Sequence, residues 1–101
     1  MPMGQLGFDL VTLSGPATLY ELAEIRETLL SAMTEGRDLL IDLEPSGPWD
    51  LAGLQLLISA VALGHKMGLS VHLVNVPRVC VDIAERSGLA DWLASVTDSF
   101  L

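Results

Sequence analysis

The sequence predicts an α/β fold built on a single layer of mostly parallel β-sheet, and three observations carry that prediction. Segments with alternating apolar residues are interleaved with segments whose apolar residues recur every three or four positions. One short run, Asp38–Leu43, contains Leu39-Leu40-Ile41 and Leu43 with few polar breaks, which is typical of a strand buried at the centre of a parallel sheet. The predicted connections hold roughly three to six residues, the usual length between such elements.

The first third of the chain predicts one strand and one helix. Leu6–Leu13 alternates loosely and is predicted to be a strand that ends at the sequence Ser-Gly-Pro. Thr18–Glu35 is predicted to be a helix because its apolar residues follow helical spacing. Thr18 and Glu21 form a capping-box pattern at its start, and Gly36 is expected to end it.

The middle of the chain predicts a strand, a loop and a long helix. Asp38–Leu43 is the strand, and Glu44–Pro48 is predicted to be a loop because it holds two prolines and a glycine. Asp50 is a good N-cap for a helix over Leu51–Met67, which is apolar around most of its circumference and is closed by Gly68.

The last third predicts a strand and two short helices. Leu69–Val76 alternates well and is predicted to be a strand. Pro77 suits the first position of a helix that continues through Arg78–Ser87. Apolar residues over 89–96 predict a final short helix. With no linker, repeat or block of like charge, residues 1–101 are expected to form one domain.

Charge and composition exclude several functions. Five Lys and Arg stand against 13 Asp and Glu, a formal net charge of −8, so no nucleic-acid partner and no anionic membrane surface is expected. No apolar run reaches the length of a membrane span, and the N-terminus does not resemble a secretory signal. The lone cysteine, Cys80, rules out an intrachain disulfide. These features favour a cytoplasmic location without membrane insertion.

Catalytic and metal sites find little support in the residues. His65 and His72 lack a second ligand at helical spacing, and Cys80 lies on the apolar stripe of its helix. Asp42, Glu44 and Asp50 are candidate ligands of a divalent cation, but they match no known ligand spacing. We expect no enzyme activity, no metal and no cofactor.

The most informative region is Trp49–Leu54, where a loop carrying an indole runs into a capped helix. One interpretation is that this turn packs against the sheet, with Trp49 buried. The other is a docking surface for a protein, in which Trp49 and Leu54 supply apolar area while Ala52 and Gly53 permit close approach. A helix that is apolar nearly all round must also cover a second face, against either the first helix or a partner.

At these residues the sequence resembles the STAS domain family, which includes bacterial anti-sigma-factor antagonists and the cytoplasmic tails of sulphate transporters. The resemblance spans nearly the whole chain. It rests on Leu39-Leu40-Ile41-Asp42-Leu43, then a loop, then Asp50-Leu51-Ala52-Gly53-Leu54-Gln55-Leu56-Leu57. The resemblance implies a small sheet with helices packed on one side.

The same resemblance implies a protein partner and a switch that this chain lacks. Antagonists of the family bind an ATP-dependent anti-sigma kinase and are phosphorylated on the second hydroxyl of an Asp-Ser-Ser-Gly motif. Here Leu51 and Ala52 fill the two hydroxyl positions, so no phosphorylation is expected at the motif.

The sequence therefore predicts a non-catalytic interaction module that resembles an anti-sigma-factor antagonist and binds without phospho-switching. Its expected contact residues are Ser46, Trp49, Asp50, Leu51, Ala52, Gly53 and Leu54. Chemosensory systems and small subunits of lipid-transport ATPases remain open as alternative settings. So do a homodimer through the second helix and a small-ligand or nucleotide sensor built on Asp42, Glu44, Ser46 and Asp50.

Overall fold

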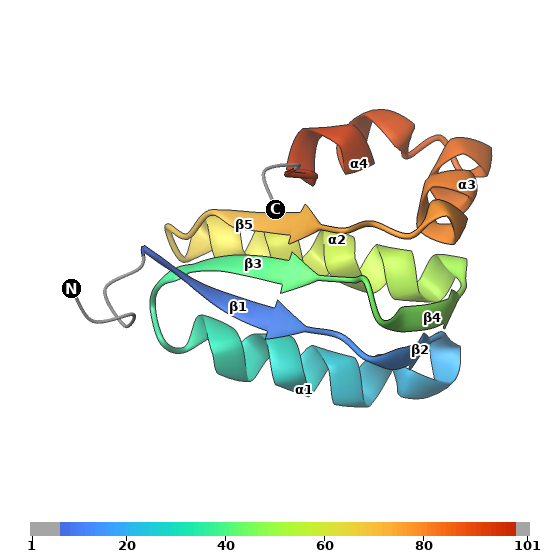
Figure 1. The fold of residues 1–101 in the computed structure, drawn as a ribbon. Coiled ribbons are helices and arrows are strands. Elements are labelled where there is room, and N and C mark those ends of the chain that lie inside the picture. Colours follow the sequence, from blue (N-terminus) through green and yellow to red (C-terminus); the bar gives the residue numbers. More distant parts are fainter. Residues whose placement is uncertain (1–6, 99–101) are drawn as a thin grey trace.

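Three parallel strands form the main sheet, in the order β1-β3-β5 (Figure 1). The computed structural model describes residues 7–98. Strand β1 spans Phe8–Thr12, β3 spans Asp38–Asp42 and β5 spans Val71–Val74. β3 pairs with both neighbours, so that Ile41 lies between Val11 and Leu73 in register. The predicted α/β class, parallel sheet and central strand are confirmed, while Leu6 lies outside the described residues.

Two short strands continue the pairing beyond the main sheet. β2 (Gly15–Ala17) lies parallel to β4 (Ser46–Trp49) in a second, two-stranded sheet. Between the sheets, the Leu13 amide donates to the Asp42 carbonyl at 3.0 Å, and the Gly15 amide donates to the Pro45 carbonyl at 3.2 Å. The prediction of a loop over Glu44–Pro48 is therefore wrong for its second half. Glycine and proline usually mark turns, and strands this short show no alternation that would outweigh them.

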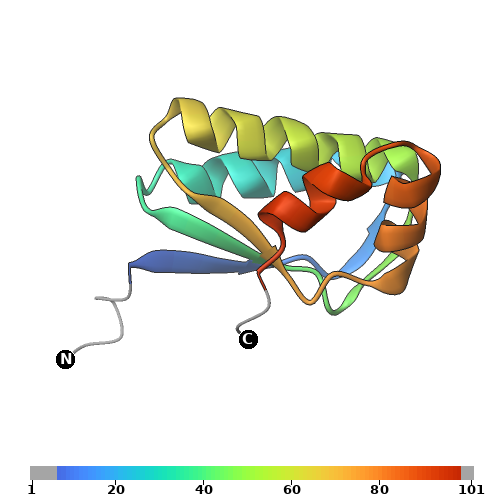
Figure 2. The same ribbon diagram turned by 90° about the horizontal axis from the view of Figure 1, so that it is seen from above.

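The two long helices cover one face of the sheet (Figure 2). A 3-10 turn, η2 (Leu19–Glu21), leads into α1 (Leu22–Met33), and α2 spans Leu51–Lys66. The predicted capping box is present, because the Glu21 carboxylate accepts from the Thr18 amide at 2.8 Å. α1 packs against α2, so the first helix covers part of the apolar circumference of the second.

Two short helices follow β5. α3 spans Arg78–Arg86, with Pro77 as its N-cap residue rather than its first residue, and α4 spans Ala90–Val96. After α4 the chain returns to β5, where Thr97 bridges to Leu73 and the Asp98 amide donates to the Leu73 carbonyl at 2.7 Å. This segment lies along the outer side of β5 and leaves β1 as the opposite edge strand.

The core between sheet and helices is aliphatic, as the composition predicts. Its fully buried side chains come from both layers: Leu29, Met33, Leu39, Ile41, Leu43, Leu54, Leu57, Val71, Leu73, Val74 and Cys80. Burial among these groups raises the pKa of the Cys80 thiol to about 12, because the thiolate would lose its hydration. Cys80 is thus a packing residue.

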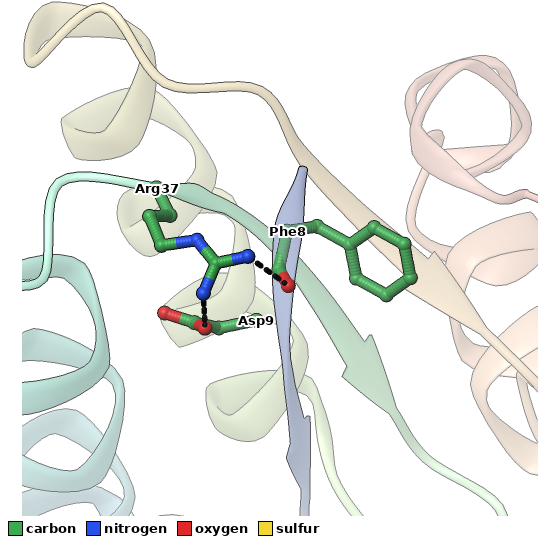
Figure 3. Close-up of polar contacts among 3 residues, drawn as sticks. All are labelled: Phe8, Asp9 and Arg37. Atoms are coloured by element: carbon green, nitrogen blue, oxygen red, sulfur yellow. Dashed lines mark hydrogen bonds and ion pairs between the residues drawn. The ribbon is translucent and has the colours of Figure 1, made fainter. Parts of the chain in front are cut away.

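Arg37 ties the edge strand to the start of the central strand (Figure 3). Its guanidinium lies 3.1 Å from an Asp9 carboxylate oxygen and donates to the Phe8 carbonyl at 3.2 Å. Figure 3 shows the ring of Phe8 directed away from the guanidinium. Arg37 therefore binds both the backbone and one side chain of β1.

Candidate functional site

Asp50 organises the beginning of α2. One carboxylate oxygen accepts from the Gly53 amide at 3.0 Å, which confirms the predicted N-cap. The other accepts from the Leu19 amide in η2 at 2.9 Å. These two backbone hydrogen bonds, with Gly53 the larger cause, hold the pKa of Asp50 below its usual range, because they favour the ionised form. The same carboxylate thus serves two chain segments.

Gly53 allows α2 to approach strand β2. A Cβ atom at this position would collide with the carbonyl oxygen of Ala17 and would meet the Trp49 ring at 3.0 Å. Gly53 is itself buried. The close approach that Gly53 permits is therefore made by the protein's own backbone at Ala17.

Trp49 and Leu54 lie in the core. Trp49 is 7% exposed and Leu54 is 0% exposed, so neither offers the apolar surface predicted for it. The indole nitrogen donates to Ser46 Oγ at 2.7 Å, and Ser46 Oγ donates in turn to the Leu43 carbonyl at 2.6 Å. The alternative interpretation, in which the turn packs against the sheet, holds for Trp49, and Ser46 serves to satisfy the buried indole.

A different set of apolar side chains surrounds Asp50 at the surface. Leu19 is 62% exposed, Tyr20 is 91% exposed and Leu51 is 40% exposed. With Asp50 and the half-buried Ala52, these residues form what we call the helix-start face. The bond from Leu19 to Asp50 brings η2 beside the start of α2. Leu51 and Ala52 belong to the predicted site, whereas Leu19 and Tyr20 were missed.

Leu19 and Tyr20 lie at a helix start whose sequence shows a capping pattern and no other indication of a docking surface. Leu19 fits the helical spacing of the apolar residues over Thr18–Glu35, which predicts a place on the apolar stripe of that helix. In the structure it belongs to the 3-10 turn that precedes α1, which shifts it out of the helical stripe. The one indication in the sequence that an aromatic side chain is exposed here is the position of Tyr20 in the first turn of a capped helix.

The acidic groups weighed as ligands do not converge. One oxygen of Asp42 accepts from the Glu44 amide and from the Asn75 side chain, each at 3.0 Å, while Asp50 is engaged by Gly53 and Leu19. Over residues 7–98, no three His, Cys, Asp or Glu side chains are grouped so that they could hold a metal ion.

The C-terminal end of α2 leaves some apolar area uncovered. Leu63 is 36% exposed and Met67 is 46% exposed at the C-terminal end of α2. In the part of the chain from 7 to 98, no helix combines the length and hydropathy needed to cross a bilayer.

Comparisons with known proteins agree with this architecture. The family model described as "Mlab, STAS domain" matches residues 7–97. A sulfate transporter family protein from Wolinella succinogenes superposes with a TM-score of 0.72 at 18% identity, over 91% of this chain and 76% of that one. The unphosphorylated anti-sigma factor antagonist SpoIIAA gives 0.71 at 17% identity, over 99% and 85%.

The SulP transporter STAS domain from Vibrio cholerae gives a TM-score of 0.67 at 19% identity, over 99% of this chain and 77% of that one. At these identities the structures share the fold with this chain. No curated protein matches the chain significantly in sequence.

Proposed function

The chain belongs to the family described as "Mlab, STAS domain", and from that membership we propose that it is a non-catalytic module that binds another protein through the helix-start face. The proposal places it in the bacterial cytoplasm, the compartment expected from its sequence. The leading partner is an ATP-dependent kinase of the anti-sigma type. A chemosensory protein or a transport ATPase is the alternative.

The observation that carries the proposal is the exposure of Leu19, Tyr20 and Leu51 around one capped helix start. Apolar side chains that gather at the surface commonly mark interaction sites, and tyrosine is enriched among the residues that dominate binding. Asp50 holds the two segments together, so the face is organised before a partner arrives and little ordering cost accompanies binding.

Binding at this face is proposed to be constitutive. Neither Leu51 nor Ala52 carries a hydroxyl group, and the Ser46 hydroxyl is engaged in a hydrogen bond that it donates to the Leu43 carbonyl. A phosphoryl group would add up to about two negative charges at a helix start. Control of this module is therefore proposed to act on the partner's abundance or state.

Charge supports a partner with a basic rim around an apolar centre. The chain carries a net charge of −8, which accelerates encounter with a cationic surface and repels an acidic one. Association is accordingly expected to slow as salt is raised.

Affinity capture tests the proposal. Wild-type protein, Tyr20→Ala and Ala52→Glu serve as baits in lysate of the source bacterium. Ala62→Glu, which places the same charge on an exposed alanine of α2, is the matched control. Loss of one specific protein with both face variants and its retention with Ala62→Glu supports the proposal, and mass spectrometry then decides among the three partner classes. Capture that all baits share equally rejects the helix-start face.

A homodimer through α2 is a second candidate, favoured by the exposure of Leu63 and Met67. Sedimentation of the wild type and of Leu63→Lys tests it: a dimer that the substitution dissociates supports this interface, while a wild-type monomer at high concentration rejects it.

A further inference from the structure

A groove of about 530 Å³ lies where β5 meets the two C-terminal helices. Figure 1 shows α3 beyond the end of β5 and α4 running back alongside that end of β5, on the side away from β3. None of the helix-start face residues lines the groove. Its walls are apolar and come from the β5–α3 connection and both helices: Val76, Val81, Ala84, Ala90, Leu93 and Ala94.

Small side chains keep the groove open. Ala90 and Ala94 are exposed on α4, and Ala84 is buried on α3. A larger residue at any of these positions would occupy the space between the helices. The volume falls within the range of about 300–1,000 Å³ that small-molecule sites occupy.

The polar side chains that line the groove offer few hydrogen-bond donors. The Asn75 side-chain nitrogen is committed to Asp42 at 3.0 Å, and the Thr97 hydroxyl donates to the Leu93 carbonyl at 2.7 Å. Glu85 and Asp98 add two carboxylates. Among the described residues that line the groove, none is a lysine, arginine or histidine. A ligand that brings hydrogen-bond donors of its own therefore suits these side chains better than one that brings only acceptors.

We propose that this groove binds a small amphipathic cation, namely a primary ammonium group on a short hydrocarbon body. The hydrocarbon covers the alanine and leucine walls, and the ammonium group donates to Glu85. A nucleotide or another anion would face two carboxylates in a protein of net charge −8, which is unfavourable. This site is separate from the proposed docking face and does not depend on it.

Three hexyl probes that differ only in head group test the charge requirement. Hexylammonium, hexanol and hexanoate are titrated separately at pH 7 into the ¹⁵N-labelled full chain, and amide shifts in α3 and α4 are followed. Hexylammonium should bind with a dissociation constant of the order of millimolar, as expected for a ligand of so few atoms. Hexanol should bind more weakly and hexanoate weakest. Equal binding of the alcohol and the ammonium probe, or the absence of shifts in α3 and α4, overturns the proposal.

Matched variants locate the site. Ala94→Phe should abolish hexylammonium binding, while Ala62→Phe, the same change on an exposed alanine of α2, should leave it intact. Glu85→Gln should weaken it about two- to five-fold, as for an exposed charge pair, and Glu24→Gln should not. Their spectra also report whether each variant is folded. Retained binding in a folded Ala94→Phe protein, or equal losses in both glutamate variants, overturns the assignment.

Discussion

The backbone amide of Leu19 donates a hydrogen bond to Asp50 at 2.9 Å, although the two residues lie 31 positions apart in the chain. Asp50 caps its own helix with the other carboxylate oxygen, so the same side chain fixes η2 against the start of α2. The relative placement of Leu19, Tyr20 and Leu51 depends on this bridge. Asp50 is thus a positioning residue for the proposed docking face.

Substitution of Asp50 separates its two contributions to stability. Asp50→Ala should lower the free energy of unfolding by about 2 kcal/mol, since it removes a helix cap and a second backbone hydrogen bond. Asp50→Ser keeps a capping hydroxyl but cannot serve both amides, so its loss should be about half as large. Urea denaturation measures both. Equal losses would show that the cap contributes nothing, and an unchanged stability of Asp50→Ser would show that the bond to Leu19 contributes nothing.

The depressed pKa of Asp50 predicts a pH-dependent contribution. Because the folded state favours the ionised carboxylate, its stabilising effect is complete above the ordinary aspartate pKa of about 4 and is lost as pH falls through the lower folded value. The stability difference between wild type and Asp50→Asn should therefore be greatest near neutral pH and shrink as the pH drops below about 4. Urea midpoints at several pH values measure it, and a difference that stays constant down to pH 2 contradicts the expectation.

Gly53→Ala should destabilise the protein by about 2 kcal/mol. The new Cβ would collide with the Ala17 carbonyl, and a backbone atom cannot rotate aside as a side chain can. This cost exceeds the gain of about 1 kcal/mol in helix propensity. Gly7→Ala is the control, because nothing lies within 4 Å of a Cβ there. Thermal or urea unfolding compares the two, and a stabilised Gly53→Ala protein would show that α2 moves freely away from β2.

Arg37→Ala should cost about 1–2 kcal/mol, because it removes the ion pair with Asp9 and the hydrogen bond to the Phe8 carbonyl. Asp9→Asn removes only the ion pair and should cost less than about 1 kcal/mol. Arg78→Ala is the control, since its pair with Asp82 is far more exposed. If urea denaturation gives the same loss for all three variants, the backbone contact to β1 has no stabilising role.

The sequence predicted the α/β alternation, the central strand and the caps at Thr18 and Asp50, because each of these follows from local spacing or from one side chain. It could not predict that Gly15 and Ser46 lie in paired strands, since parallel pairing between short segments depends on a crossover through α1. It left Trp49 open between the core and a docking surface, because the hydrogen bond from the indole nitrogen to Ser46, which accompanies burial, is set by the turn geometry. Tyr20 was missed for a related reason, since its exposure depends on how η2 meets α2.

Cys80 is the chain's lone cysteine, and its side chain is completely shielded. A water-soluble alkylating reagent should therefore not react with Cys80 while the protein is folded. The rate at which Cys80 is modified then measures how often the interior opens transiently. Because Cys80 is unreactive in the native protein, a cysteine introduced at Tyr20 would be the only thiol open to labelling. A fluorophore attached there would report directly when a partner binds.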